Sequence, residues 1–376
     1  MKITLAAGLY PPEMGGPATY AAMLESELPD RGITINAVPF GWVRHYPKII
    51  RHCVYAWKLW QASKDTNVIY ALDPISVGLP ALLISRLRRQ PFVIRLGGDY
   101  AWEQGRVRFG VTDMLDDFLE NKKDWPLPVK VLAWLQSFVV SRANRVVAPS
   151  KYLKGVIQKW GVQPDKIQVI YSALYPLEVT GLRDDLRVQL NYTNPTIVSV
   201  GRLVPWKGFR ILIEVVAELR KDYPEISLVI VGDGNDKAVL EAQVAKNDLH
   251  SCVRFTGRLS KAALGATIRA ADVFVLNTAY EGLAHQLIEV MDIGTPIVTT
   301  KAGGNPELIT DGVNGFLVEY NNKLELKEAI ARVLNHPESR ERMTQSARLR
   351  SKEFNKSVVV TDIEAVLKEL YAQSIA

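Results

Sequence analysis

The sequence predicts an α/β protein made of two doubly wound domains, each a parallel sheet covered by helices. The chain has 376 residues, more than a single domain usually contains. Strand-like and helix-like segments alternate from one end to the other, and many strand-like segments are continuously apolar, such as SLVIV at 227–231 after its first residue. Continuous apolar strands indicate strands that are buried on both faces of a parallel sheet.

The strand-like segments fall into two groups, with a turn-rich junction at 175–195 between them. The first group is 3–7, 34–39, 68–72, 92–96, 145–148 and 168–171, and the second is 196–200, 227–231, 253–256, 273–276, 296–299 and 315–318. Helical patterns fill the intervals, and those of the first half lie near 17–28, 47–62, 76–89, 128–142 and 151–160. We therefore expect a first domain at 1–178 and a second at 179–356, with a C-terminal helix at 357–376 that packs back on the first domain.

The composition is that of an ordinary globular protein, with 48% hydrophobic and 23% charged residues. It excludes a disordered, collagen-like or coiled-coil chain. No apolar run approaches the roughly 20 residues of a membrane-spanning helix. Cys53 and Cys252 are the two cysteines and cannot form a disulfide framework. Their number predicts a reducing, cytoplasmic location.

Positive charge is concentrated in the first half of the chain. The formal net charge is +6, and residues 41–160 carry 19 Lys and Arg against 9 Asp and Glu, or +10, so the remainder sums to −4. Such a region is typical of proteins that bind nucleic acid, an anionic membrane or an anionic substrate. No zinc-finger, RNP or basic-zipper pattern is present, so the sequence predicts no nucleic-acid partner. A membrane surface and an ordinary solvated surface are both open interpretations.

Two loops of the first domain follow strands and contain candidate ligand-binding residues. In YPPEMGGPATY, Gly15 and Gly16 permit close approach of a ligand, and Pro17 suits the first turn of the helix that follows. The free N–H groups at that helix start favour phosphate, although a simple strand-to-helix turn also explains the loop. In IRLGGDYAWE, Asp99 is either a carboxylate that faces a ligand crevice or a helix cap.

Two loops of the second domain are more specific. GRLVPWKG contains Arg202 and Lys207, a guanidinium and an ammonium group that together suit a pyrophosphate. In AYEGLAHQLIEVMDIGTPIVTT, Glu281 precedes a helix start expected at 282–284, and Glu289 lies eight residues further on. A helix would separate these two carboxylates by roughly 12 Å along its axis. This span suits a ligand that has a polar group at each end and a phosphate on the helix N-terminus.

These segments, in this order, resemble the retaining glycosyltransferases of family 4, which have the two-domain GT-B fold. The resemblance rests on the Gly15–Gly16 loop, GRLVPWKG, the E-x7-E pair, APSKYL at 148–153 and KAGGNPELITDGVNGFLV at 301–318, and it covers essentially the whole chain. It implies that a nucleotide-diphosphate sugar is the donor, bound in the cleft between the domains. The implied acceptor is a hydroxyl of a glycan or of a lipid-linked acceptor, in cell-envelope or exopolysaccharide synthesis.

The resemblance also implies roles for individual residues. Arg202 and Lys207 would neutralise the departing diphosphate, so that no metal is needed. Glu281 would bind hydroxyls of the donor sugar, Glu289 those of the ribose, and Asp99 would contact the sugar near its anomeric centre. The remaining donor-binding residues implied by the resemblance are Gly15, Gly16, Arg258, Leu259, Gly282, Leu283 and Ala284. No cofactor other than the sugar nucleotide is expected.

Two other functions are compatible with the same architecture. A sugar-nucleotide epimerase or a sugar phosphorylase could share the two domains, although Arg202 and Lys207 with Glu281 and Glu289 fit sugar transfer better. A degenerate transferase that serves as a binding or scaffold protein would be expected to lose charged site residues, and all of them are present. The five His and two Cys are scattered, so the sequence predicts no metal site.

The segment WVRHYPKIIRHCVYAWKLW at 42–60 interleaves cations with Trp and Tyr. This mixture is typical of helices at a lipid interface, and it predicts a protein that is peripheral at the inner leaflet of the plasma membrane. The alternative is that the aromatic side chains pack on the sheet and the cations lie in water.

Overall fold

The computed structural model describes residues 1–13, 15–193 and 195–375. Met14 of the first glycine loop, Asn194 of the expected junction and Ala376 of the expected C-terminal helix lie outside the described residues. The chain divides into two compact units. Unit 1 contains Met1–Ser172 and the C-terminal segment from Lys356 on, and unit 2 contains Ala173–Asn355. The sequence places the first boundary at 178 instead.

Unit 1 has a six-stranded parallel sheet in the order β2-β1-β3-β4-β5-β6. Its strands are β1 (Lys2–Ala7), β2 (Thr34–Pro39), β3 (Val68–Ala71), β4 (Phe92–Arg95), β5 (Arg145–Ala148) and β6 (Ile167–Val169). Its helices are α1 (Gly16–Glu27), α2 (Lys48–Ala62), α3 (Gly78–Arg88), α4 (Tyr100–Arg108), α5 (Leu115–Glu120), α6 (Leu127–Ser141), α7 (Lys151–Lys159) and α16 (Lys356–Ile375). Short 3-10 turns lie at Pro29–Arg31, Phe40–Val43, Lys122–Asp124 and Pro164–Lys166.

Unit 2 repeats this plan with the strand order β12-β11-β10-β7-β8-β9. Its strands are β7 (Thr196–Val200), β8 (Ser227–Val231), β9 (Val253–Gly257), β10 (Val273–Leu276), β11 (Ile297–Thr300) and β12 (Phe316–Val318). Its helices are α8 (Arg183–Gln189), α9 (Phe209–Leu219), α10 (Lys237–Lys246), α11 (Lys261–Ala270), α12 (His285–Ile293), α13 (Asn305–Leu308), α14 (Lys323–Asn335) and α15 (Pro337–Ser351). The 3-10 turns Pro205–Lys207 and Lys352–Phe354 complete the unit.

Every strand that the sequence predicts is present, with ends within two residues of the expected positions. The strands are buried because helices cover both faces of each sheet, so apolar runs such as Ser227–Val231 enter the core of unit 2. The α/β, doubly wound prediction is therefore confirmed. Helices α4 and α5 have no counterpart in the sequence prediction.

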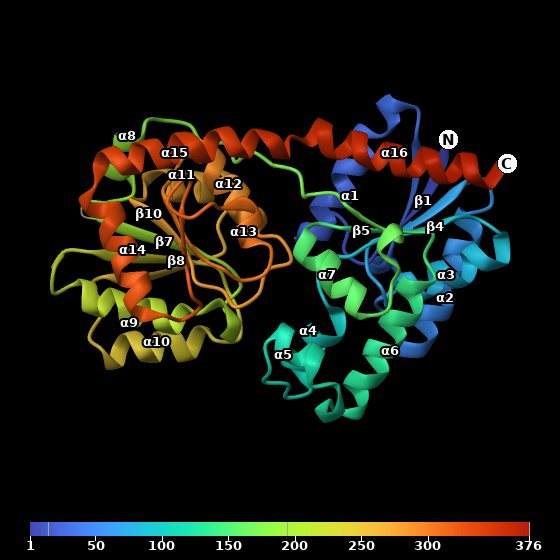
Figure 1. Ribbon diagram of the computed structural model, residues 1–376, viewed down its shortest axis with the longest axis horizontal. Helices are drawn as coiled ribbons and strands as arrows, with labels where there is room; N and C mark the ends of the chain where they lie inside the picture. Colours follow the sequence, from blue (N-terminus) through green and yellow to red (C-terminus); the bar gives the residue numbers. More distant parts are fainter. Residues whose placement is uncertain (14, 194, 376) are drawn as a thin grey trace. The chain divides into compact units, whose positions relative to one another are not determined.

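Helices of unit 1 form two layers (Figure 1). In Figure 1, α1 and α16 lie on one side of the sheet, and α2, α3 and α6 lie on the other. Helix α16 is held to unit 1 by ion pairs: Arg31 contacts Glu364 at 2.9 Å, and Arg145 pairs with Glu369. Arg31 also donates a 2.7 Å hydrogen bond to the Thr361 hydroxyl. These contacts explain why the end of the chain belongs to the same unit as its beginning.

Candidate functional site

The strand order of unit 2 reverses between β7 and β10. From β7 the chain proceeds to β8 and β9 on one side, and it then returns to place β10 on the other side of β7. In open parallel sheets, ligands bind at the carboxyl ends of the strands beside such a switch point. The loops that follow β7 and β10, residues 201–208 and 277–284, therefore mark the position where a ligand is expected.

Side chains and backbone join these two loops. The Lys207 ammonium group forms an ion pair with the Glu281 carboxylate, and both side chains are largely buried. The Ala279 N–H donates to the Trp206 carbonyl at 2.8 Å. The Asn277 amide donates to the Gly208 carbonyl at 2.9 Å. The loop that contains Lys207 is thus fixed against the loop that contains Glu281.

The loop after β11 supports Glu281 from another side. The Gly304 N–H donates to the Glu281 carbonyl at 2.9 Å. Gly303 has a φ of 57°, and a β-carbon at this position would lie 2.0 Å from that carbonyl oxygen. Only glycine permits this approach without displacing backbone, which explains the glycine at position 303. Three loops at the carboxyl edge of the sheet therefore position Glu281.

Arg202 and Lys207 provide positive charge at the same edge in different surroundings. Arg202 is exposed, and its guanidinium carbon lies 5.6 Å from the centre of the Trp206 ring. Such cation–π contact restricts the long Arg side chain. Lys207 closes a 3-10 turn, Pro205–Lys207, just before α9. The structure therefore places both sequence-predicted cations in the loop beside the switch point.

The helix after β10 begins later than the sequence predicts. Helix α12 starts at His285, with Ala284 as its N-cap, so Gly282, Leu283 and Ala284 form a non-helical lead-in. The predicted helix start at 282–284 is therefore early by at least one residue. The roughly 12 Å separation of Glu281 and Glu289 assumed a continuous helix and does not describe this loop.

Glu289 lies on α12, one turn after its first residue, and is mostly buried. Burial raises the pKa of its carboxyl group to about 7, and the positive charge of Lys261 opposes this shift. Lys261 begins α11, directly after Arg258 and Leu259 in the loop that follows β9. Arg258 is exposed and Leu259 is half-buried. Unit 2 therefore contains three more of the predicted donor-binding residues, Glu289, Arg258 and Leu259, besides Lys207 and Glu281.

Gly15, Gly16 and Asp99 belong to unit 1. Gly16 is the first residue of α1, and Pro17 follows it in the first turn, as the sequence predicts. The preceding loop is tied down by Arg44, which pairs with Glu13 and donates to the Gly8 carbonyl at 2.7 Å. The structure therefore separates the predicted site residues into a unit 2 group and a smaller unit 1 group.

Asp99 is the N-cap of α4. Its carboxylate accepts the Trp102 N–H at 2.9 Å, and the residue is 1% exposed. Burial raises the pKa of its carboxyl group, against the opposing effect of hydrogen bonds from Trp102, Gln136 and Trp160. The capping interpretation of the sequence is thus realised. Asp99 also lines a pocket of about 340 Å³ together with Gln136 and Trp160, so a role toward a ligand stays a prediction.

Asp73 is a candidate site residue that the sequence prediction did not name. In unit 1 the strand order reverses between β1 and β3, and Asp73 lies just after β3 at this switch point. Its carboxylate accepts the N–H groups of Ile75 at 3.0 Å and Val77 at 3.2 Å. Burial raises its pKa to about 6. A β-carbon on Gly8, at the end of β1, would lie 2.2 Å from the Asp73 carboxylate. The Asp-Pro that follows an apolar strand was the available signal.

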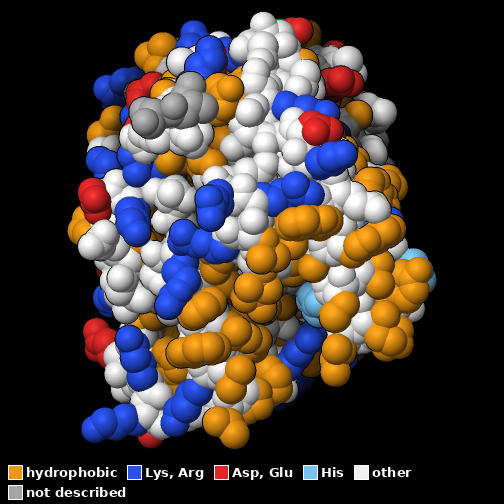
Figure 2. Space-filling view, turned by 90° about the vertical axis from the view of Figure 1, so that its right-hand side faces the viewer, with side chains coloured by type: hydrophobic (Ala, Val, Ile, Leu, Met, Phe, Trp, Pro, Cys, Tyr) orange, Lys and Arg blue, Asp and Glu red, His pale blue; other side chains and the backbone are white. Residues whose placement is uncertain are grey.

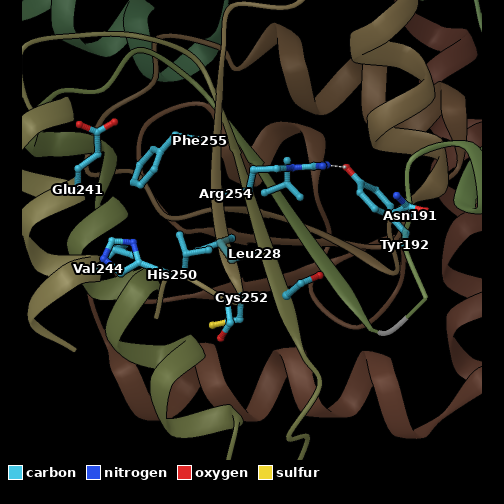
Figure 3. A pocket seen from close by; sticks show the side chains of 13 residues that line it. Asn191, Tyr192, Leu228, Glu241, Val244, His250, Cys252, Arg254 and Phe255 are labelled. Carbon is cyan, nitrogen blue, oxygen red and sulfur yellow. Dashed lines mark hydrogen bonds between the residues drawn. The ribbon is translucent and has the colours of Figure 1, made fainter. Parts of the chain in front are cut away.

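A pocket of unit 2 lies elsewhere (Figure 3). It has a volume of about 600 Å³, and its lining residues include Tyr192, Ser227, His250, Cys252 and Arg254. In Figure 3 the Arg254 and Tyr192 side chains point toward one another, joined by a 3.3 Å hydrogen bond. The pocket borders the first residues of β8 and β9, so it lies at the amino ends of these strands. Ligands of doubly wound sheets bind at the opposite edge, so this pocket is not the predicted site.

Two properties of the described residues, 1–13, 15–193 and 195–375, bear on the setting of the site. No group of three or more His, Cys, Asp or Glu residues among them is arranged to hold a metal ion. None of the helices they form combines the length and the apolar character that crossing a bilayer requires. Metal independence stays a prediction.

Comparisons with known proteins agree with this architecture. The model of the family "Glycosyltransferase Family 4" matches residues 13–174, and that of "Glycosyl transferases group 1" matches residues 183–350. An uncharacterized glycosyltransferase of Methanocaldococcus jannaschii is 30% identical over 237 residues, which are 62% of this chain and 60% of that protein. The amylovoran biosynthesis glycosyltransferase of Erwinia amylovora is 26% identical over 267 residues, 67% of this chain and 60% of that protein. The match thus spans about three fifths of these curated relatives.

A solved structure matches nearly the whole chain. The crystal structure of Anabaena HepE in complex with UDP and glucose has a TM-score of 0.77 and 21% identity, and it covers 98% of this chain and 100% of that one. This likeness shows the fold, the two-domain GT-B arrangement of Rossmann-like units. These two family models match consecutive segments, which correspond closely to the two units and together span most of the sequence. The chain therefore belongs to the group 1 glycosyltransferases of family 4.

Proposed function

We propose that this protein is a retaining glycosyltransferase that uses a nucleotide-diphosphate sugar, UDP- or GDP-linked, as the donor of a hexose. The observation that carries the proposal is the placement of Arg202 and Lys207 in the loop beside the unit 2 switch point, where Lys207 pairs with Glu281. Two cations near the N-terminus of α12 suit a diphosphate better than a neutral ligand. HepE of Anabaena, which shares the fold, binds UDP and glucose.

In the proposed donor complex, Arg202 and Lys207 contact the diphosphate. The amide groups of Gly282, Leu283 and Ala284 face phosphate oxygens, as does the glycine loop of Gly15 and Gly16. Glu281 accepts hydrogen bonds from sugar hydroxyls and Glu289 from the ribose, while Arg258 and Leu259 lie beside the base. Asp99 stabilises positive charge at the anomeric centre. No cofactor and no metal ion takes part.

The reaction proposed for this site exchanges one bond at the anomeric carbon for another. The bond from the anomeric carbon to the β-phosphate oxygen breaks, and the electron pair leaves with the nucleoside diphosphate. An acceptor hydroxyl oxygen forms the new bond on the same face, and its proton passes to the departing phosphate. The anomeric configuration is retained. Preorganised cations accelerate such a step because negative charge on the leaving group grows in the transition state.

The acceptor in this proposal is a hydroxyl of a glycan or of a lipid-linked saccharide in the cytoplasm. Cell-envelope or exopolysaccharide synthesis is the setting that we propose. The Erwinia relative is a glycosyltransferase of amylovoran biosynthesis, which supports a polysaccharide product.

Ligand-induced stabilisation tests the donor. The midpoint of thermal unfolding should be measured with UDP, GDP, their glucose, galactose and mannose conjugates, and AMP as a control for generic nucleotide binding. Binding to the folded state stabilises by RT ln(1 + [L]/Kd), so the cognate donor should raise the midpoint most. The same shift in the Lys207→Ala variant as in the wild type would contradict the proposed diphosphate site.

Product analysis separates the alternatives. Slow release of nucleoside diphosphate and free sugar from the stabilising donor supports transfer. NMR of the first-released sugar should show the donor's anomeric configuration. Conversion of the intact sugar nucleotide to its epimer would instead identify an epimerase, and tight binding without any turnover would identify a binding protein.

A further inference from the structure

Helix α2 of unit 1 has apolar side chains on its solvent face as well as on its core face. Tyr55 and Leu59 point into the core and are fully buried. On the outer side, Ile49 is 81% exposed, and Ile50, Trp57 and Trp60 are also exposed. An outer face of this kind is unusual, because helices that cover a sheet normally present polar residues to water.

Helices α3 and α6 extend the same surface. Helix α3 packs between α2 and α6. Leu83 and Leu87 of α3 are one turn apart, and Leu87 is 70% exposed. Leu127, Val131 and Trp134 of α6 recur at helical spacing, and Trp134 is 62% exposed. We call the exposed side chains of Ile49, Ile50, Trp57, Trp60, Leu83, Leu87, Leu127, Val131 and Trp134 the apolar face. Figure 2 shows hydrophobic side chains gathered on this side of unit 1, with Lys and Arg beside them.

The charged side chains of helices α2, α3 and α6 are all positive. Helix α2 contains Lys48, Arg51 and Lys58, and α3 contains Arg86 and Arg88. Helix α6 contributes Lys130, and Arg89 and Arg142 follow α3 and α6 as their C-caps. None of these helices contains Asp or Glu. Helices α14 and α15 on the surface of unit 2 carry both signs, as a merely solvated surface does.

Several cations are held against aromatic rings at the border of the apolar face. The Arg88 guanidinium carbon lies 3.8 Å from the centre of the Trp60 ring, and the same group donates to the Trp60 carbonyl at 2.6 Å. The Lys58 ammonium lies 5.5 Å from the Trp42 ring centre. Trp with an adjacent Lys or Arg suits the headgroup level of a bilayer, where one end of the pair is apolar and the other is wet.

We propose that the apolar face is a docking surface for a lipid bilayer that contains anionic headgroups. Charge complementarity selects this occupant. A second copy of the chain in a two-fold interface would place like cations against one another. A nucleic acid would leave the central Ile, Leu and Trp side chains without apolar partners, whereas lipid acyl chains cover them. The surface docks without crossing the bilayer, and the inference does not depend on the chemistry of sugar transfer.

Co-sedimentation with vesicles tests the surface. The full chain should be mixed with vesicles of phosphatidylcholine alone or with 30 mol% phosphatidylglycerol, at low and high salt. We expect binding that rises at least tenfold with the anionic lipid and falls with salt. Trp57→Ser with Trp134→Ser should lower binding to anionic vesicles at least tenfold. Arg86→Glu with Lys58→Glu should weaken the preference for anionic lipid.

Matched substitutions in unit 2 provide the control. Leu324→Ser with Leu349→Ser removes two side chains that are each 66% exposed, and it should leave vesicle binding unchanged. All substituted side chains are exposed or lie at the surface, so each variant should unfold at the temperature of the wild type, which is measured alongside. Equal, negligible binding of the wild type to both vesicles at low salt would overturn the proposal. So would a stable dimer, seen by sedimentation velocity without lipid, that the Trp57→Ser and Trp134→Ser pair dissociates.

Discussion

The Lys207 ammonium group forms an ion pair with the Glu281 carboxylate across the point where the strand order of unit 2 reverses. Each residue fixes the other: Lys207 lies in the loop after β7, and Glu281 lies in the loop after β10, where Gly303 and Gly304 hold its backbone. The pair keeps a cation in a defined place before any ligand arrives. Preorganisation of this kind is what makes a charge effective in a transition state.

Removal of either cation should impair transfer and leave the fold intact. In the proposed donor complex each cation is a preorganised donor to the departing diphosphate, so we expect Arg202→Ala and Lys207→Ala each to lower kcat/KM by about 10² to 10³, or about 3–4 kcal/mol. Steady-state kinetics with the cognate donor measures this. Lys237→Ala is the matched control, because Lys237 is a surface cation of unit 2 that pairs with Glu241 on the same helix. If only Lys207→Ala lowers kcat/KM, and if its thermal stability falls as well, the ion pair of Lys207 with Glu281 has a structural role instead.

Chelation should leave the transfer rate unchanged. In the proposed donor complex, Arg202 and Lys207 supply the positive charge that a divalent cation provides in metal-dependent transferases. The rate should be measured before and after incubation with EDTA and gel filtration. Loss of activity that Mn²⁺ or Mg²⁺ restores would reject the metal-free mechanism.

Glu289→Gln should stabilise the protein at alkaline pH. The pKa of this carboxyl group is about 7 in the folded chain, against 4.5 for the unfolded chain. The folded state therefore binds more protons between these values, and the contribution of Glu289 to stability is lost as pH rises through 7. The variant should gain up to about 3 kcal/mol over the wild type at pH 8 and almost nothing at pH 4.5. Unfolding in urea across this pH range measures the difference.

The same variant should bind the donor more weakly. If the Glu289 carboxylate accepts ribose hydroxyls, its replacement by an amide should weaken nucleotide binding about tenfold, the effect of one charged hydrogen bond. A Glu289→Gln variant that is more stable than the wild type but binds the donor more weakly would show that Glu289 is a binding residue and not a structural one. Unchanged affinity would exclude the ribose contact.

Asp99 should show two separable effects. Asp99→Ala removes the α4 cap and should cost about 0.5–2 kcal/mol of stability, whereas Asp99→Asn keeps a capping oxygen and should cost less. A role at the anomeric centre requires the carboxylate charge, so both variants should lower kcat. Thermal unfolding and steady-state kinetics measured in parallel distinguish these effects. Normal kcat in Asp99→Asn would leave the residue as a cap only.

The sequence by itself determined the architecture, because local patterns of apolar and turn residues indicate where each strand and most helices begin and end. The largely apolar run Ser227–Val231 indicated a strand buried on both faces, and Pro17 after two glycines marked the start of α1. The same patterns placed Arg202, Lys207 and Glu281 after strands. Helix α4 lacked such a pattern, because a glycine, Gly105, interrupts it and its buried residues are few.

Only the tertiary structure decided which residues meet. The contact between Lys207 and Glu281 spans 74 residues, and that between Gly8 and Asp73 depends on β3 pairing beside β1. Strand order sets both contacts, and no local pattern encodes it. The apolar face likewise depends on tertiary contacts and not on a local pattern alone. The sequence pointed to the aromatic residues of α2, but packing of α3 and α6 beside α2 brings Leu87 and Trp134 to the same side of unit 1. Exposure of a side chain follows from the packing of its neighbours, and only the folded chain specifies those neighbours.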